Sequence, residues 1–208
     1  MGAGIQLGPN VFRMFKALDL VNPIEEFAVF PDALVMRDAI TANEITLTPI
    51  NTASFEKQFR FPYGAIYRPD LLNVLKRACK DFSNIKIIFN KRVLTARQTE
   101  TSASVICEDH SSYDAEVVIG ADGLWSEIRK NIVDDEAPRV SGHIAYRAVL
   151  PLDEVHDKAR ENEVVLWAGP KTHLVQYPLH RGEIMSLVAV FIVIDMRKVG
   201  TYMAKVRS

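Results

Sequence analysis

Helix-like and strand-like hydrophobic patterns alternate along the chain, which favours an α/β protein. After Pro9 and Asn10, apolar residues recur at spacings of three and four. This spacing predicts a helix with one core-facing side, made of Val11, Met14, Phe15 and Leu18. A second helix is predicted to follow Asp70, with a core-facing side made of Leu71, Leu72, Leu75, Ala78, Cys79 and Phe82.

Short apolar runs between turn-forming residues predict the strands. Two of them, 33–37 and 44–48, are joined by a polar loop and are interpreted as a hairpin inserted from a later sheet. Further strands are predicted at 85–89, 93–96, 103–107, 117–119, 143–150, 164–167, 172–177 and 184–191. The last four are evenly spaced with turns between them, which predicts an antiparallel sheet. Three aromatic residues are interpreted as core rather than pocket lining: Phe55, Phe59 and Phe61.

One segment, Glu116 to Arg129, has a strand, turn and helix pattern. Its apolar run ends at Gly120-Ala121-Asp122-Gly123, and a helix-compatible stretch follows from Leu124 to Ile132. In such a unit, glycines allow close backbone approach, and a carboxylate after the strand can accept hydrogen bonds from ribose hydroxyls. Asp122 is therefore the first candidate binding residue, and a simple glycine-rich turn is the alternative for these four residues.

Composition narrows the classes of partner. The 208 residues are 48% apolar with a net charge of -1, which argues against nucleic acid or an anionic membrane surface as the main partner. Cys79 and Cys107 form neither a disulfide framework nor a metal-ligand pattern and are interpreted as buried apolar residues. The longest apolar stretch, about 11 residues, is too short to span a membrane. With no signal-peptide pattern at its start, the chain is expected in the reducing cytoplasm.

Four stretches together resemble one known family. The run V-V-I-G-A-D-G-x-x-S-x-x-R, from Val117 to Arg129, resembles the second fingerprint of flavin-dependent aromatic hydroxylases, which are single-component monooxygenases. Three more stretches match that family in the same order: Gly2 to Asn10, Tyr67 to Leu72, and His143 to Arg147. The resemblance covers roughly residues 2 to 191 and is greatest to salicylate hydroxylase and 3-hydroxybenzoate 6-hydroxylase.

The resemblance implies a fold class and a reaction. We expect a partial FAD-binding, Rossmann-like α/β fold with an antiparallel substrate-binding sheet. The expected domains are a partial FAD domain at 1–140 with the inserted hairpin near 30–62, a substrate sheet at 141–191, and a divergent tail at 192–208. Such enzymes reduce FAD with NADH or NADPH and insert one atom of molecular oxygen into an aromatic acid such as salicylate or hydroxybenzoate. A homodimer is also expected.

The resemblance also assigns site residues. Cofactor-binding positions are Gly2, Gly4, Gln6, Arg68, Val93, Asp122 and Gly123. The first three would lie beside the flavin ring, Val93 near the adenine, and Arg68 would offer a fork of donors. In the substrate sheet, His143 could act as a base, with a structural histidine as the alternative, and Tyr146 or Arg147 could hold the substrate carboxylate. Adjacent strand residues face opposite sides, so only one of Tyr146 and Arg147 is expected to face the ligand.

Two other family fingerprints are missing. No strand with G-x-G-x-x-G precedes Gly2, and no G-D-A-A-H-P segment follows Phe191. We therefore expect a chain truncated at both ends, with weak or no FAD binding of its own. The tail is interpreted as a product of altered splicing or reading frame, with a basic interaction tail as the alternative. A non-catalytic remnant or interaction protein of the same fold is the competing function, whereas a nicotinamide-only dehydrogenase is disfavoured.

Overall fold

The chain folds into two compact units. The computed structural model describes residues 4–133, 138–139 and 141–192. The first unit combines Met1–Ser83 with Gly142–Ser208, and the second is Asn84–Ser141. Residues 1–83 thus group with the later sheet, whereas the expected domains group them with residues 84–140. The assignment of a function to each domain stays a prediction.

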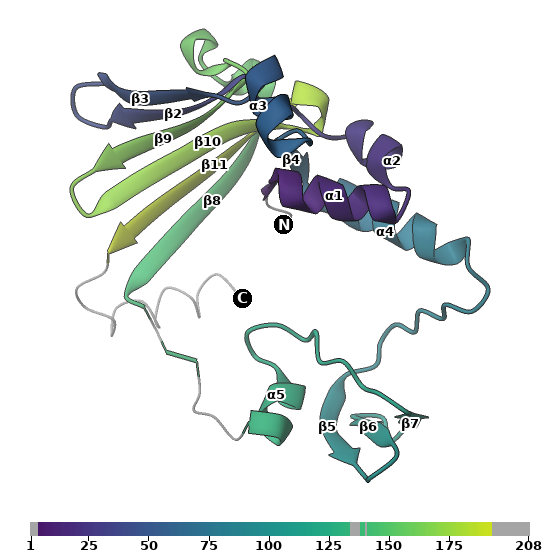
Figure 1. Ribbon diagram of the computed structural model, residues 1–208. Coiled ribbons are helices and arrows are strands. Elements are labelled where there is room, and N and C mark those ends of the chain that lie inside the picture. Colours follow the sequence, from purple (N-terminus) through teal and green to yellow (C-terminus); the bar gives the residue numbers. More distant parts are fainter. Residues whose placement is uncertain (1–3, 134–137, 140, 193–208) are drawn as a thin grey trace. The chain divides into compact units, whose positions relative to one another are not determined.

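A six-stranded sheet dominates the first unit, and its strands lie side by side in the order β3-β2-β9-β10-β11-β8 (Figure 1). The bounds are β2 Ala33–Asp38, β3 Glu44–Pro49, β8 His143–Pro151, β9 Glu163–Gly169, β10 Thr172–Leu179 and β11 Ile184–Ile192. All neighbouring pairs are antiparallel except β2 and β9, which are parallel. The predicted antiparallel sheet is confirmed, and so is the inclusion of the early hairpin in it.

The two faces of this sheet carry different apolar clusters. Val164, Tyr177 and Leu179 are buried with Ala65 of strand β4, Gly64–Tyr67. We call this the β4-side face. On the opposite face, Trp167 packs on a cluster of small and branched residues, namely Ala33, Val35 and Val165. Short 3₁₀ turns connect the strands at η1 Leu152–Glu154, η2 Asp157–Ala159 and η3 His180–Gly182.

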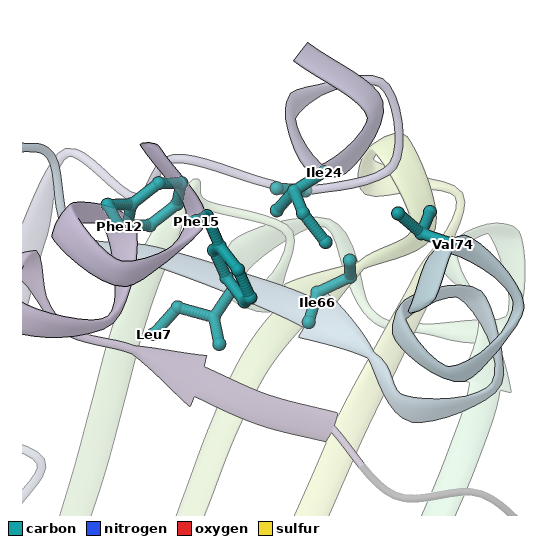
Figure 2. Packing of buried hydrophobic residues seen from close by; sticks show 7 residues of the cluster. Leu7, Phe12, Phe15, Ile24, Ile66 and Val74 are labelled. Atoms are coloured by element: carbon teal, nitrogen blue, oxygen red, sulfur yellow. The ribbon is translucent and has the colours of Figure 1, made fainter. Parts of the chain in front are cut away.

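A second core fills the space between the helices and a two-stranded sheet. Strand β1, Gly4–Leu7, pairs antiparallel with β4. The helices packed there are α1 Pro9–Ala17, α2 Val21–Glu25 and α4 Arg68–Lys80. Figure 2 shows the apolar side chains that these elements direct toward one another: Leu7, Phe12, Phe15, Ile24, Ile66 and Val74.

The predicted helices exist, but part of each predicted buried side is wrong. Met14 in α1 and Leu18 directly after it are both 63% exposed, while Phe12 is fully buried. Phe12 and Phe15, three positions apart, set the side that contacts β1 and β4, and this rotates Met14 and Leu18 into solvent. In α4, Leu72 is 62% exposed, because Val74 faces the core instead.

A further helix, α3 Ala53–Phe59, occupies the segment in which alternating aromatic residues suggested core positions. The Thr52 side chain accepts a hydrogen bond from the backbone of Phe55 and so caps the helix start. Phe55 and Phe59 are one turn apart and contact each other with ring centroids 4.6 Å apart. None of the residues of α3 is buried, so this helix is a surface element.

The second unit contains a three-stranded meander and a helix. The strands are β5 Val93–Gln98, β6 Ala103–Cys107 and β7 Ser112–Ala115, and the helix is α5 Glu127–Val133. The strands predicted at 85–89 and 117–119 are wrong. Val117 is 72% and Ile119 84% exposed. Within the described residues these runs have no neighbouring strand, and a strand needs one to satisfy its backbone hydrogen bonds.

The remaining expectations about the fold concern the tail, membranes and metals. Of the expected divergent tail, only Ile192 is described, as the last residue of β11, and 193–208 lie outside the described residues. No described helix is long and apolar enough to cross a membrane. In the described part of the chain, no three His, Cys, Asp or Glu residues gather as a metal site would require.

Candidate functional site

The β4-side face collects the polar groups of β8, β10 and β11. Tyr177 pairs directly with Ser186 across β10 and β11, and Arg147 pairs with Val188, two positions after Ser186. Residues that are directly opposite in antiparallel strands share a face, as do residues two apart. Arg147, Tyr177 and Ser186 therefore all point to the β4 side.

Tyr177 lies where this face meets β1. Burial raises the pKa of the Tyr177 hydroxyl, while a hydrogen bond with Ser186 and the positive charge of Arg147 act in the opposite direction. The hydroxyl oxygen is 2.5 Å from the point where a Cβ on Gly4 would lie. Only glycine fits at position 4, because any side chain would collide with the Tyr177 ring. The expected cofactor-binding residue Gly4 thus lies directly against the face that carries Arg147.

Gln6 is fixed by a second tyrosine. The Tyr63 hydroxyl donates a hydrogen bond of 2.6 Å to Gln6 Oε1. Burial and the proximity of Tyr177 raise the pKa of Tyr63, so its hydroxyl stays protonated and remains a donor at neutral pH. Because Oε1 accepts from Tyr63, the orientation of the Gln6 amide is set, and its NH₂ group points away from that contact.

The three candidates in the substrate sheet divide between its faces. His143 is four positions from Arg147 on β8 and shares its face, whereas Tyr146 lies on the opposite face. There the Tyr146 ring contacts Phe191, with centroids 5.9 Å apart. Tyr146 is 61% exposed. The geometry favours Arg147 over Tyr146 as a partner of a ligand on the β4 side, and the roles of His143, Tyr146 and Arg147 stay predictions.

Arg68 is the first residue of α4 and directly follows β4. Because Gly4 pairs with Tyr67, strand pairing places the start of α4 beside the first residues of β1. Helix α4 has no side-chain cap at its start, and Asp70 in its first turn contacts His180 instead, with 2.6 Å between Nδ1 and Oδ2. Gly2 lies outside the described residues, so its predicted role remains a prediction.

The G-A-D-G segment in the second unit is built as a helix start. Both oxygens of Asp122 accept hydrogen bonds, Oδ1 from the Ser126 hydroxyl and Oδ2 from the backbone of Glu127 and Ile128 at 2.8 and 3.2 Å. These bonds, led by the one from Ser126, lower the pKa of Asp122. Ser126 in turn accepts from the backbone of Arg129 at 2.9 Å. The D-G-x-x-S-x-x-R spacing therefore caps α5 twice.

The two glycines of this segment have separate functions. Gly123 has φ of +81° and an open space around it, so it adopts a conformation that other residues rarely reach. A Cβ on Gly120 would come within 2.7 Å of the buried Ile128 side chain, so this glycine permits the loop to pack on α5. An open cleft of about 520 Å³ adjoins the loop and is lined by Gly120, Asp122, Gly123, Ser126 and Arg129, among others.

Val93, the expected adenine neighbour, begins β5 and pairs with Cys107. A separate open cleft of about 570 Å³ lies beside it, lined by Asn90, Lys91, Arg92, Glu108 and Asp109. The Lys91 ammonium contacts the Asp109 carboxyl. Hydrogen bonds from Lys91 and from Ser111 hold the pKa of Asp109 well below its usual range.

The structure thus brings Gly4, Gln6 and the Arg68 end of α4 together with the sheet face of Arg147 in the first unit. It brings Asp122 and Gly123 together in the second unit, where Val93 also lies. Sequence reasoning missed Tyr63, Tyr177 and Ser186. A signal for Ser186 existed, since it is a polar residue inside a predicted apolar strand.

Several known proteins are similar to this chain in sequence. No protein-family model matches the chain. It is 35% identical over 188 residues to 3-hydroxybenzoate 6-hydroxylase 1 of Aquipseudomonas alcaligenes, covering 90% of this chain and 48% of the relative. It is 37% identical over 191 residues to 3-hydroxybenzoate 6-hydroxylase of Klebsiella oxytoca, covering 92% of this chain and 48% of that protein. The chain therefore spans about half the length of the curated relatives it matches.

Solved structures show the same fold. A salicylate hydroxylase substrate complex aligns with a TM-score of 0.74 at 20% identity, covering 94% of this chain and 49% of that one. Klebsiella pneumoniae HpxO complexed with FAD and uric acid aligns with a TM-score of 0.79 at 18% identity, covering 93% of this chain and 48% of that one. The chain is homologous in sequence to about half the length of the 3-hydroxybenzoate 6-hydroxylases, as its motifs predicted, and its fold is similar to that of the solved hydroxylase structures.

Proposed function

We propose that this chain supplies the substrate-binding sheet and part of the FAD site of a monooxygenase that hydroxylates an aromatic acid of the hydroxybenzoate or salicylate type. One observation carries the proposal. A cationic and hydroxyl-bearing sheet face, with Arg147, Tyr177 and Ser186, lies against the strand of Gly4 and Gln6. An aromatic carboxylate needs one cation, hydroxyl donors and an apolar floor, and Val175 and Val188 provide that floor beside Arg147.

The residues fit FAD in two places. The cleft beside Asp122 and Gly123 has room for a sugar chain, and the Asp122 carboxylate retains acceptor capacity beyond its three hydrogen bonds. In the first unit, Gly4 and Gln6 would border the flavin ring, and Arg68 would offer donors to the cofactor. When bound, FAD would be reduced by NADH or NADPH and would supply the redox chemistry with oxygen. Arg147 would hold the carboxylate of the acid, and one hydroxyl of the hydrogen-bonded Tyr177 and Ser186 pair would donate to it.

The first test is binding of an aromatic acid to the 208-residue chain. We expect 3-hydroxybenzoate to shift the backbone amide NMR signals of Arg147, Tyr177 and Ser186. The uncharged 3-hydroxybenzamide should bind more weakly. Arg147→Ala should weaken binding of the acid about tenfold, because it removes a charge-assisted hydrogen bond. Arg37→Ala is the matched control, since Arg37 lies on the opposite face of the same sheet and should change affinity less than about twofold. Equal binding of acid and amide, or shifts confined to the opposite face, would contradict the proposal.

The second test concerns the cofactor. The chain spans about half the length of the curated relatives it matches. We therefore expect its FAD affinity to be weaker than micromolar in a fluorescence titration. Retention of FAD at micromolar concentration or tighter would show that the residues present suffice for binding.

A non-catalytic interaction protein is the second candidate function. It is favoured by the exposed apolar residues of the second unit, such as Val117, Ile119 and Trp125. A reproducible protein partner recovered without flavin, combined with no aromatic-acid binding, would support this alternative. A cytoplasmic location and a homodimer stay predictions.

A further inference from the structure

The turn between β10 and β11 has a left-handed backbone and is held by side-chain contacts to neighbouring elements. His180, Arg181 and Gly182 have φ values of 50°, 59° and 85°, so three consecutive residues are left-handed and two of them are not glycine. Such a backbone is strained at each non-glycine residue and persists only where surrounding contacts fix it. The side chains of His180 and Arg181 provide those contacts.

His180 contacts three separate elements. Its Nδ1 is 2.6 Å from Asp70 Oδ2 in the first turn of α4, and because a carboxylate only accepts, Nδ1 carries the proton of this hydrogen bond. The ring stacks on Phe27 with centroids 6.4 Å apart and meets the edge of Tyr67 at 6.3 Å. On the other side of the ring, Glu183 Oε2 is 3.6 Å from Nε2, too far for a good hydrogen bond.

Arg181 reinforces the same attachment. Its guanidinium donates to the carbonyl and the carboxylate of Glu26, both at 2.8 Å, and lies over the Phe27 ring at 5.0 Å. The turn is thus fastened to α4, to β4 and to the segment after α2.

This attachment connects the two halves of the proposed site. The turn directly joins the strands that carry Tyr177 and Ser186, while Asp70 lies two residues after Arg68 at the start of α4. We infer that His180 is a positioning residue: its hydrogen bond to Asp70 holds the Arg68 end of α4 in place relative to the Tyr177 and Ser186 pair. The functional consequence, that His180 couples the cofactor-binding residues to the acid-binding residues, rests on the proposed function.

The decisive experiment compares two substitutions. His180→Phe keeps the aromatic contacts but removes the donor, whereas His180→Asn can place its amide NH₂ where Nδ1 lies. The readout is amide hydrogen exchange of Leu72, Asn73 and Val74, whose N–H groups bond to the carbonyls of the first turn of α4. We expect His180→Phe to accelerate exchange about tenfold through local opening, and His180→Asn to stay within about threefold of the unsubstituted chain. His173→Phe, an exposed histidine on β10, is the matched control and should change nothing.

Unchanged exchange in His180→Phe, or equal acceleration in both variants, would overturn the role of His180. A second arm addresses the coupling: in an FAD titration extended to millimolar concentration, His180→Phe should weaken binding as a single substitution but not in an Arg68→Ala background. Equal weakening in both backgrounds would overturn action through Arg68. Absence of aromatic-acid binding in the unsubstituted chain counts against the proposed function alone, because the exchange data decide on the hydrogen bond independently.

Discussion

Single residues at crowded positions define the candidate site more sharply than its charged groups do. Gly4 has no side chain because Tyr177 occupies the space, and Gly123 is needed for its positive φ. The motif matches identified both glycines as site residues but could not supply these reasons. Packing of Tyr177 on Gly4 joins residues more than 170 positions apart, and no local pattern reports such a contact.

The crowding at Gly4 gives a prediction. Gly4→Ala should lower the free energy of unfolding of the first unit by about 1–3 kcal/mol, the usual cost of overpacking, because its Cβ would meet the Tyr177 hydroxyl. Chemical denaturation followed by the fluorescence of Trp167 measures this. Gly8→Ala is the control, since its Cβ would meet only the flexible Asn10 side chain. Adding Tyr177→Phe should recover part of the loss; a loss as large for Gly8→Ala would refute the explanation.

Strands and helices were predictable where their patterns are local. The hairpin of β2 and β3 and the four later strands follow from alternation and turn residues, and α1 and α4 from their start signals. The buried face of each helix was less predictable, because the burial of Phe12 and Val74 depends on their packing against strands β1 and β4. The false strand at 117–119 has the right composition, but strand formation also needs a neighbour, which composition does not report.

At the level of the sheet, Glu163 at the start of β9 gives a pH prediction. Burial, and then repulsion from Glu161, raises the pKa of Glu163, and its Oε2 is buried without a hydrogen-bond partner. A carboxyl whose folded pKa is raised contributes stability below its unfolded pKa and loses it as pH rises through the folded value. Glu163→Gln should therefore raise Tm at pH 7, by about 2 °C, and have little effect near pH 4.

Thermal unfolding at both pH values checks this expectation. The exposed Glu154→Gln is the control and should leave Tm unchanged at either pH. A gain at pH 4 as large as that at pH 7 would show that ionisation of Glu163 is not the cause.

Across the whole molecule, exposed apolar surface is unevenly distributed. Of the 22 large hydrophobic residues that are exposed in the described part of the chain, 11 lie in residues 84–141. Exposed apolar residues in this number favour association with other chains. The chain spans about half of its relatives, and its second unit carries two apolar runs, 85–89 and 117–119, with no strand beside them among the described residues.

This distribution predicts concentration-dependent association. Ile119→Lys should reduce self-association in sedimentation velocity experiments without lowering Tm, because Ile119 is 84% exposed. Ile128→Lys, which places a charge at a buried position of the same unit, should instead unfold that unit. An Ile119→Lys protein that associates as strongly as the unsubstituted chain would show that another surface is responsible.

The parallel pairing of β2 with β9 constrains the order in which the protein can fold during synthesis. Ala33 pairs with Glu163, so β2 cannot begin to pair with β9 until 130 further residues have been made. At cellular synthesis rates this interval is roughly ten seconds. During it the β2–β3 hairpin, marginal by itself, has an open edge. Nascent chains should therefore need protection at β2 until β9 has emerged from the ribosome.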